Sequence, residues 1–384
     1  MDDLFLIQEE LTDEERQIQA SIYRYIEDEL LAKLPGDFEN ATFPKSFIQD
    51  AANLGLLGSF LPESEGGSDA SYRTYGLICE ALEWGDSALR SFVSVQSSLG
   101  IYPIYQYGTP LQKNRFLKDM TQGKIISCFG LTEPDAGSDP AGMKTHAKKV
   151  KGGYILNGSK TWITNAAIAD IAIVWAKTDE GIKGFIVEKN FKGFKAQTIH
   201  SKMSLRISLS GQLFFEDVFV PDENVLDTKP GLGAAFSCLN QARFGISFGV
   251  MGAASFCFEN TLKYLLDRKQ FNRPLASFQL IQNDLALMYT EIQKARCLNL
   301  QLAKLKDNQQ IQPEMISLAK SNNCREALKI ARTCRNLLGG NGISLEYHII
   351  RHMLNLESTF TYEGTDNVHK LILGRYLTGI NAFE

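Results

Sequence analysis

GKIISCFGLTEPDAGSD, residues 123–139, is where the sequence changes from a helical to a strand pattern. Before this stretch, apolar residues recur at helical spacing between short breakers, and Thr12 with Glu15 forms a capping box that predicts a first helix. Residues 91–107 are apolar and predict a buried helix that lies against another element. Within the stretch, residues 125–131 form a short apolar run typical of a buried strand. The sequence therefore predicts an α-helical N-terminal region that gives way to strands near residue 125.

Strand signals continue beyond this stretch to about residue 230. Lys151-Gly152-Gly153 lies between two short apolar runs and predicts a hairpin, and Asn157-Gly158 predicts another turn. Runs of β-branched and aromatic residues follow at 171–175, 184–187 and 213–220. We predict an all-β middle domain, in the form of a small barrel.

The helical pattern returns after Pro230-Gly231 and continues to the end of the chain. Three segments, residues 234–268, 275–305 and 313–338, are longer than average helices and predict an antiparallel bundle. The predicted fold class is therefore α+β. We expect an N-terminal α-helical domain at residues 1–125, a middle β-barrel domain at 126–233, and a C-terminal helical bundle domain at 234–384.

Composition and charge limit the class of partner. The 384 residues carry a net charge of −4 with a pI near 5.9, which argues against nucleic acid or an anionic membrane as the main partner. No apolar run approaches the ~20 residues that span a bilayer, so no membrane insertion is expected. The first residues are acidic, with neither a secretory signal nor a transit peptide. We expect a bacterial cytoplasm, or the mitochondrial matrix for a processed eukaryotic chain.

The cysteines and histidines predict neither disulfides nor a metal site. Seven cysteines are scattered singly without a CxxC motif, which is typical of reduced thiols in a reducing compartment. His348 and His352 are four residues apart, but they lack the intervening acid and the third ligand of a helical zinc motif.

A tight turn near the C-terminus, Tyr362-Glu363-Gly364-Thr365-Asp366-Asn367, places one acid between two helical segments, residues 348–360 and 367–379. Gly364 permits a backbone conformation that other residues resist, and Thr365 or Asp366 can cap the following helix. Two interpretations are open on these residues alone. Glu363 faces a pocket as a functional carboxylate, or it is a solvated residue on a loop.

Four other stretches suit the binding of a polar or phosphate-containing ligand, and each also has a structural interpretation. LTEPDAGSD (131–139) and the stretch around Trp162 offer hydroxyls and an aromatic face, although the first can be an ordinary loop and the second core. DRKQF (267–271) is a plausible phosphate clamp or a favourably charged helix end. LLGGNG (337–342) is a glycine-rich break. Neither GxGxxG nor a Walker A loop occurs, so a classical nicotinamide site is not expected.

The order and spacing of these motifs carry a family resemblance. LTEPDAGSD, KTWITN, DRKQF, LLGGNG and YEGT together resemble the acyl-CoA dehydrogenase family of flavoenzymes, from about residue 5 to the end of the chain. The resemblance implies a helical domain, a β-barrel and a four-helix bundle, FAD as the cofactor, a homotetramer, and an electron-transfer flavoprotein as the electron acceptor.

The resemblance also implies roles for individual residues. Glu363 matches the base that removes the α-proton of the acyl thioester, and Ala242 stands where some members carry that base on a bundle helix instead. The residues matching FAD contacts, some of them across a subunit boundary, are Leu131, Thr132, Ser138, Trp162, Ile163, Thr164, Arg268, Gln279, Leu337, Gly339, Gly340, Thr365, Asp366 and Asn367. The residues matching substrate contacts are Glu83, Arg90, Ser91, Ser138, Asn240, Arg243, Tyr362 and Gly364.

Arg90-Ser91 opens an otherwise apolar helix and bears on the acyl group. A guanidinium can hold a carboxylate bidentately, and Glu83, two turns upstream, can orient it, although the two can also form an ordinary surface pair. This stretch, with CFGLTEP, LLGGNGIS, NLE and GRYLTGINAF, is similar to the glutaryl-CoA dehydrogenases of the family. That similarity implies oxidation and decarboxylation of glutaryl-CoA to crotonyl-CoA and CO2, as in lysine and tryptophan degradation. Still open are dehydrogenation without decarboxylation, a short-chain substrate, an oxidase, and a non-catalytic acyl-CoA-binding homologue.

Overall fold

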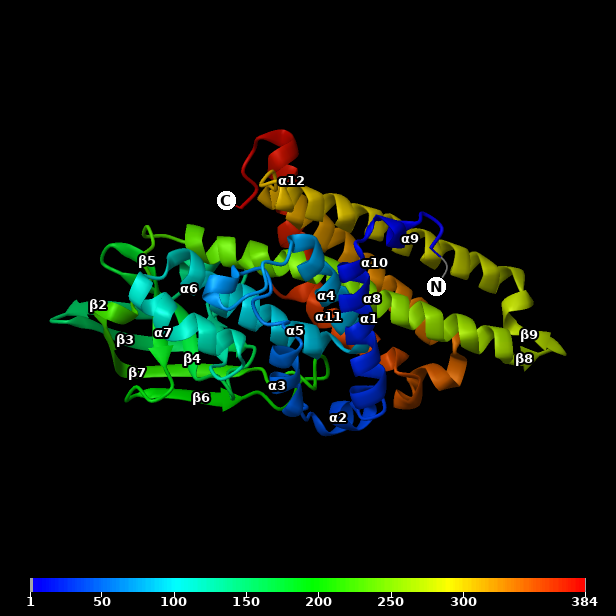
Figure 1. Cartoon of the computed structure of the whole chain (residues 1–384), viewed down its shortest axis with the longest axis horizontal. Coiled ribbons are helices and arrows are strands. Elements are labelled where there is room, and N and C mark those ends of the chain that lie inside the picture. The colour runs from blue at the N-terminus through cyan, green and yellow to red at the C-terminus, as the bar shows by residue number, and fades with distance from the viewer. Residues whose placement is uncertain (1–2, 384) are drawn as a thin grey trace.

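The structure is a computed structural model that describes residues 3–383 (Figure 1). Met1, Asp2 and Glu384, which the predicted domain bounds include, lie outside the described residues. Figure 1 shows the β-sheet at the left end of the molecule and long helices that extend from it toward the right end. The change of pattern near residue 125 is confirmed, because helices precede it and strands follow it. The predicted α+β class is thereby confirmed.

Short helices form the N-terminal region. The predicted capping box is present, since the Thr12 hydroxyl accepts from the Glu15 amide and the Glu15 carboxylate accepts from the Thr12 amide. Seven α-helices lie in this region: α1 Asp13–Tyr25, α2 Leu34–Asn40, α3 Ser46–Asn53, α4 Tyr72–Gly85, α5 Ser87–Ser94, α6 Tyr102–Tyr107 and α7 Pro110–Thr121. Two π-helical segments, Ile26–Leu30 after α1 and Val95–Ile101 between α5 and α6, continue the helical path.

The segment from α5 to α6 is the predicted buried helix, and it packs against the sheet. Every residue from Ser87 to Ile101 is buried. The Gln96 side-chain oxygen accepts from the amide and the hydroxyl of Ser127, on strand β1, at 2.8 and 2.9 Å. A side chain at Gly100 would collide with the Ser127 hydroxyl, so the close approach requires glycine there. This contact fixes the helix that carries Arg90 relative to the sheet.

Seven strands form one mixed sheet in the order β1-β4-β2-β3-β7-β6, with β5 paired to the other side of β4. The pairing of β1 with β4 is parallel, whereas β2–β3, β3–β7, β4–β5 and β6–β7 are antiparallel. Within the described residues no pairing joins β5 to β6, so the barrel is open. The strands are β1 Ser127–Gly130, β2 His146–Val150, β3 Gly153–Ile163, β4 Ile171–Thr178, β5 Gly181–Glu188, β6 Phe194–Thr198 and β7 Gly211–Pro221.

The prediction of a turn at Asn157-Gly158 is wrong. Both residues lie inside β3, where the register against β7 shifts between Leu156 and Gly158. Gly158 has φ +139°, and a Cβ there would lie 2.5 Å from the Thr145 hydroxyl oxygen. The glycine therefore serves a β-bulge with a close neighbour, which is the other common reason for glycine within a strand.

The C-terminal region is the predicted bundle of long helices. Helices α8 Gly233–Asp267, α9 Gln279–Asp307 and α10 Pro313–Leu337 match the three predicted segments within a few residues at each end. Helix α11 Ile349–Thr361 packs with them, and α12 Asp366–Thr378 follows. A short hairpin of β8 Lys269–Gln270 and β9 Arg273–Pro274 joins α8 to α9 at the right end of the molecule in Figure 1.

A buried polar joint connects the three regions. Asp86 caps α5 by accepting from the Ala88 amide, and its other carboxylate oxygen accepts from Arg351 and from the Asn355 amide group at 2.9 Å. The side-chain oxygen of Asn355 accepts from the backbone amide of Leu205, which lies 2.8 Å away in the loop between β6 and β7. Asp86, Arg351 and Asn355 are all 0% exposed. One asparagine on α11 therefore binds both the N-terminal helices and the sheet region.

Replacing Asp86 with alanine is expected to lower the free energy of unfolding by about 3–5 kcal/mol, because Arg351 would stay buried without its partner and α5 would lose its cap. Urea unfolding monitored by circular dichroism measures this. Asp119→Ala, which removes an exposed ion pair with Lys124, is the matched control and should change stability by less than about 0.5 kcal/mol. Equal effects of the two substitutions would contradict the joint.

Candidate active site

The turn between α11 and α12 has an uncommon backbone. Glu363 has φ +52° and Gly364 has φ +96°, so two consecutive residues adopt left-handed conformations. For a residue with a side chain this costs roughly 1–2 kcal/mol and persists only where the surroundings impose it. The Thr365 hydroxyl accepts from the Val368 amide at 3.3 Å and caps α12, which confirms the predicted cap. The turn is thus a defined structure and not a loose loop.

Two buried cations hold the three consecutive carbonyls of this turn. Lys320 Nζ, on α10, donates to the Tyr362 and Gly364 carbonyl oxygens at 2.8 and 2.7 Å. Arg243 Nε, on α8, donates to the Glu363 carbonyl oxygen at 2.7 Å. The turn is therefore fastened to two different helices of the bundle.

The Glu363 side chain lies in a desolvated place among cations. Its Oε2 atom is buried and has no hydrogen-bond partner in the described part of the chain. Burial raises the pKa of Glu363, and the positive charges of Arg243, Arg90 and Lys320 oppose that rise. A carboxylate with a raised pKa and a free oxygen can accept a proton from a bound molecule. Glu363 is therefore half-buried with one buried carboxylate oxygen, which favours the functional interpretation over a fully solvated residue on a loop.

Next to Glu363 lies a buried chain of polar groups. Arg90 Nε donates to Glu83 Oε2 at 2.6 Å, and Arg90 Nη2 donates to the Tyr362 hydroxyl. Arg90 is 1% exposed and Glu83 is fully buried, so they are not a surface pair. A side chain at Gly249 on α8 would collide with the Glu83 carboxylate, which explains the glycine. The carboxylate and the phenol hold the pKa of Arg90 well above its usual value.

This arrangement leaves Arg90 capacity for a ligand. A guanidinium has five N–H groups, and Glu83 and Tyr362 engage only two of them. Burial raises the pKa of Tyr362 far beyond that of free tyrosine, so the phenol stays protonated. Ser91, the next residue on α5, is also buried. The group can therefore bind a small anion such as a carboxylate next to Glu363.

The other predicted substrate residues on α8 lie beside the turn. The Asn240 side-chain oxygen accepts from Arg243 Nη1 at 3.0 Å. At Gly364 an added Cβ would meet the ring of His369 at 3.1 Å and the Arg243 guanidinium at 3.4 Å. Asp366 begins α12 and accepts from Ser321 at 2.6 Å. The structure thus brings the predicted residues of α4, α5, α8 and the turn together.

The predicted flavin residues of the sheet region form a separate group. Trp162 is 62% exposed at the end of β3 with φ +59°, so it is not a core residue. The Thr132 carbonyl accepts from the Thr161 amide at 2.9 Å, which joins the loop after β1 to β3. Leu131 and Ile163 are buried, Thr132 and Thr164 are half-buried, and Ser138 is exposed. An exposed indole beside half-buried hydroxyls fits a planar polar cofactor such as a flavin.

Apart from Thr365, Asp366 and Asn367 at the start of α12, the remaining predicted cofactor residues lie at the far end of the bundle. Arg268 follows α8 and is exposed, Gln279 begins α9, and Gly339-Gly340 follow α10. Asn341 donates to the Tyr264 hydroxyl at 3.1 Å, which joins the glycine-rich segment to the end of α8. Figure 1 shows this end of α8 opposite the sheet. One chain therefore does not bring these residues to Trp162.

Two buried lysines, Lys320 and Lys160, are functional candidates to which the motif analysis assigns no role. Lys320 falls on the apolar stripe of α10 formed by Ile316, Cys324 and Ala327, and a lysine at such a position is a recognisable signal. Lys160 donates to the Leu131 carbonyl at 3.0 Å and to Glu133 at 2.8 Å, beneath the LTEPDAGSD loop. Both lysines hold backbone next to predicted site residues.

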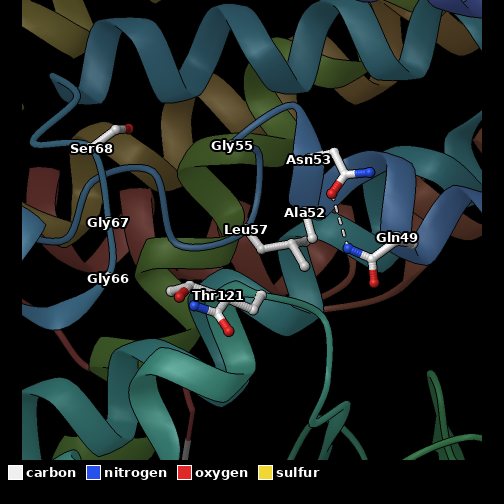
Figure 2. A pocket seen from close by; sticks show the side chains of 10 residues that line it. Gln49, Ala52, Asn53, Gly55, Leu57, Gly66, Gly67, Ser68 and Thr121 are labelled. Atoms are coloured by element: carbon white, nitrogen blue, oxygen red, sulfur yellow. Dashed lines mark hydrogen bonds between the residues drawn. The ribbon is translucent and has the colours of Figure 1, made fainter.

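Figure 2 shows a cavity of about 190 Å³ between α3, the loop at residues 66–68 and the end of α7. Its lining carries no charged side chain. Two of the lining residues lie one turn apart on α3, where the Gln49 side chain donates to the Asn53 side-chain oxygen at 3.0 Å. None of the predicted site residues lines it. This cavity is therefore separate from the cluster at Glu363.

The described residues also bear on the expectations for cysteines, for metal ligands and for membrane spans. All seven cysteines are free, and all except Cys297 are buried. His348 and His352 pack against the Phe256 ring. Residues 3–383 contain no group of three or more potential ligands that could hold a metal ion, and none of their helices is long and apolar enough to cross a membrane.

Comparison with protein families covers nearly the whole chain. Three models match, for the N-terminal, middle and C-terminal domains of acyl-CoA dehydrogenases, at residues 12–124, 128–218 and 229–378. The chain belongs to the acyl-CoA dehydrogenase family. The family assignment predicted from the motifs is thereby confirmed.

Individual family members agree with this assignment. A glutaryl-CoA dehydrogenase from Mycobacterium smegmatis, solved in complex with FADH2, is 48% identical, with 99% of this chain and 98% of that chain covered and a TM-score of 0.97. Glutaryl-CoA dehydrogenase from Desulfococcus multivorans is 33% identical over 90% of this chain and 91% of that protein. Short-chain acyl-CoA dehydrogenase from Megasphaera elsdenii is 34% identical over 95% of this chain and 98% of that protein.

Proposed function

We propose that the chain is an FAD-dependent glutaryl-CoA dehydrogenase that also decarboxylates its product to crotonyl-CoA. One observation carries the choice of substrate: a buried guanidinium with free N–H groups lies next to the carboxylate of the turn. An enzyme for a plain alkyl chain gains nothing from burying Arg90, whose desolvation is costly. The similarity to glutaryl-CoA dehydrogenases supports the same choice.

In this proposal Glu363 is the base. Its free Oε2 removes the α-proton of the acyl thioester, and burial raises its proton affinity for that step. The Glu363 amide has no protein partner in the described residues and is the donor that stabilises the developing enolate oxygen. Asn240 and Arg243 position the thioester side of the substrate. When bound, FAD supplies the oxidant that takes a hydride from the β-carbon and passes electrons to an electron-transfer flavoprotein.

Arg90, Ser91 and Tyr362 hold the distal carboxylate, and Glu83 orients Arg90. After dehydrogenation, the bond between the γ-carbon and this carboxylate breaks and CO2 leaves. The electron pair of that bond remains on the acyl group as a dienolate. Protonated Glu363 then returns its proton to the γ-carbon, which gives crotonyl-CoA. Removal and return of the proton by one residue balance the step.

The cofactor site in this proposal is shared between subunits. The flavin of each subunit is bordered by residues of the same subunit. From the sheet region these are Leu131, Thr132, Ser138, Trp162, Ile163 and Thr164. From the start of α12 they are Thr365, Asp366 and Asn367. A second group of residues lies at the end of α8 that is far from the sheet, so it holds the pyrophosphate and adenosine of a neighbouring subunit's FAD. This group is Arg268, Gln279, Leu337, Gly339 and Gly340. This division requires an oligomer, and we propose a homotetramer.

Two further assignments complete the proposal. We propose domain limits of 1–125, 126–233 and 234–384. The free cysteines suit a reducing compartment, and we propose a bacterial cytoplasm, or a mitochondrial matrix in a eukaryote.

Anaerobic titration with glutaryl-CoA tests the proposed function. We expect bleaching of the flavin absorbance and release of one CO2 for each crotonyl-CoA formed. Accumulation of glutaconyl-CoA without CO2 would show dehydrogenation only. Turnover of butyryl-CoA but not glutaryl-CoA would identify a short-chain enzyme, and rapid reoxidation by O2 would identify an oxidase. Purified protein without flavin colour would favour a non-catalytic homologue.

A further inference from the structure

Lys320 is a buried lysine that family motifs and the proposed reaction leave without a role. It is 1% exposed and lies in the first half of α10, between the buried residues Ile316 and Cys324. Its Nζ atom has two protein acceptors among the described residues, the carbonyl oxygens of Tyr362 and Gly364. These are the residues immediately before and after Glu363. The ammonium group therefore spans the backbone of Glu363 without binding its carboxylate.

The backbone that Lys320 spans needs external support. Glu363 adopts a left-handed conformation that residues with side chains avoid. Arg243 fastens the middle carbonyl of the turn, and Lys320 fastens the two outer ones. With all three carbonyls fixed, the direction in which the Glu363 side chain leaves the backbone is fixed as well. Loss of the two outer bonds would let the turn relax toward a more common conformation.

The charge of Lys320 also acts on Glu363. Burial lowers the pKa of Lys320, while the neighbouring carboxyl groups of Glu363 and Asp366 oppose that change. Lys320 in turn opposes the rise in the pKa of Glu363. The titratable and charged groups that face Glu363 are Arg90 on α5, Arg243 on α8, Lys320 on α10 and Tyr362 in the turn itself. His369 on α12 lies against the next residue, Gly364.

We propose that Lys320 is a positioning residue for Glu363, which it holds in its left-handed conformation. This inference rests on the proposed role of Glu363 as the base. A methionine at this position would fill the same stripe of α10 without the cost of burying a charge. The two short hydrogen bonds to the carbonyls on either side of one residue are the observation that a packing role does not account for.

Three variants of the full-length, FAD-loaded protein test this role. Lys320→Met removes the charge and both hydrogen bonds, and Lys320→Arg keeps a cation. Ser317→Ala, one turn earlier on α10, removes a buried hydroxyl that has no partner within residues 3–383, and it is the matched control. We expect Lys320→Met to slow flavin reduction by glutaryl-CoA about 10- to 100-fold, with less than about a threefold change in KM. Lys320→Arg should recover part of the loss, and Ser317→Ala should match the wild type.

The pH profile separates positioning from a general loss of structure. Because a positive charge near Glu363 is lost, the apparent pKa for flavin reduction should rise by about 0.5–1 in Lys320→Met. The rate should therefore fall most at pH values below the apparent pKa and recover as the pH increases. In a Glu363→Gln background, Lys320→Met should cause no further loss, because both changes act on the same group. An unchanged pH profile, or losses that simply multiply, would overturn the inference.

Hydrogen exchange of the FAD-loaded protein in the absence of substrate gives a readout without turnover. Peptides that cover residues 361–366 should exchange faster in Lys320→Met than in the wild type or in Ser317→Ala. If Lys320→Met does not fold, Lys320→Gln keeps N–H donors without the charge and replaces it in each assay. Unchanged exchange at the turn would overturn the holding role of Lys320. Faster exchange together with no reduction of wild-type flavin by any acyl-CoA would instead refute only the proposed function.

Discussion

Replacing Glu363 with glutamine is expected to slow flavin reduction by glutaryl-CoA about 10³- to 10⁴-fold while FAD stays bound. Glutamine has nearly the same shape as glutamate, but it cannot accept the α-proton, and general-base catalysis typically contributes factors of this size. The backbone contacts of the turn with Lys320 and Arg243 involve carbonyl oxygens and survive the change. Anaerobic stopped-flow absorbance of the flavin measures the rate, and the visible spectrum measures FAD content.

A second glutamate provides the control. Glu357 lies on α11 at the surface, paired with Arg332, and Glu357→Gln should leave the rate within about twofold of the wild type. The wild-type rate should increase with pH through a pKa above that of free glutamate, because burial raises the pKa of Glu363 and only the carboxylate accepts a proton. This pH dependence should be absent from the residual rate of Glu363→Gln. A rate that survives this substitution would move the base elsewhere.

Replacing Arg90 with alanine is expected to lower kcat/KM for glutaryl-CoA about 10²- to 10³-fold, and for butyryl-CoA by less than about tenfold. The loss corresponds to about 3–4 kcal/mol, which is typical when one partner of a buried, hydrogen-bonded charge pair is removed. Butyryl-CoA has no distal carboxylate, so it loses only what the altered packing costs. Steady-state assays with both substrates, reported as the ratio of the two kcat/KM values, make the comparison.

Stability has to be separated from recognition in this experiment. Arg90→Ala leaves the Glu83 carboxylate buried without its partner, which itself destabilises the fold. The double variant Glu83→Met/Arg90→Met removes both charges and should keep the selective loss for glutaryl-CoA. Arg73 lies on the same helix as Glu83 and forms a partly exposed ion pair with Glu15. Arg73→Ala breaks that pair and should not change the ratio of the two kcat/KM values. Equal losses for both substrates would refute the carboxylate-binding role.

The order of elements was predictable because local pattern and tertiary structure agree along most of the chain. Residues 313–338 combine helical spacing with a proline at the start, and α10 occupies nearly the same range. Asn157-Gly158 was misjudged because the same dipeptide suits a hairpin turn and a bulge. The difference depends on the contact with Thr145, the residue before β2, which cannot be read from the local sequence.

The candidate site was predictable to the extent that its residues lie in recognisable motifs. Arg90 donates to the hydroxyl of Tyr362, the residue before Glu363, although Arg90 and Tyr362 lie 272 positions apart in sequence. The position of Lys320 on the apolar stripe of α10 is a recognisable signal, but its role could not be predicted, because its partners are backbone carbonyls, which leave no trace in the sequence. The left-handed conformation of Glu363 was also unforeseen, since the following glycine was expected to take that role alone.

Asn355 has a consequence for attempts to recombine this protein with its relatives. A chimera that exchanged only the sheet region would keep every strand pairing yet present a foreign loop to the Asn355 side chain, which accepts from the Leu205 amide. The same side chain must still donate to Asp86 from the N-terminal helices. A buried amide has one orientation that satisfies both neighbours, so an unmatched loop leaves polar atoms without partners. Crossover points that keep residues 86, 205 and 355 from one parent should therefore give the folded hybrids.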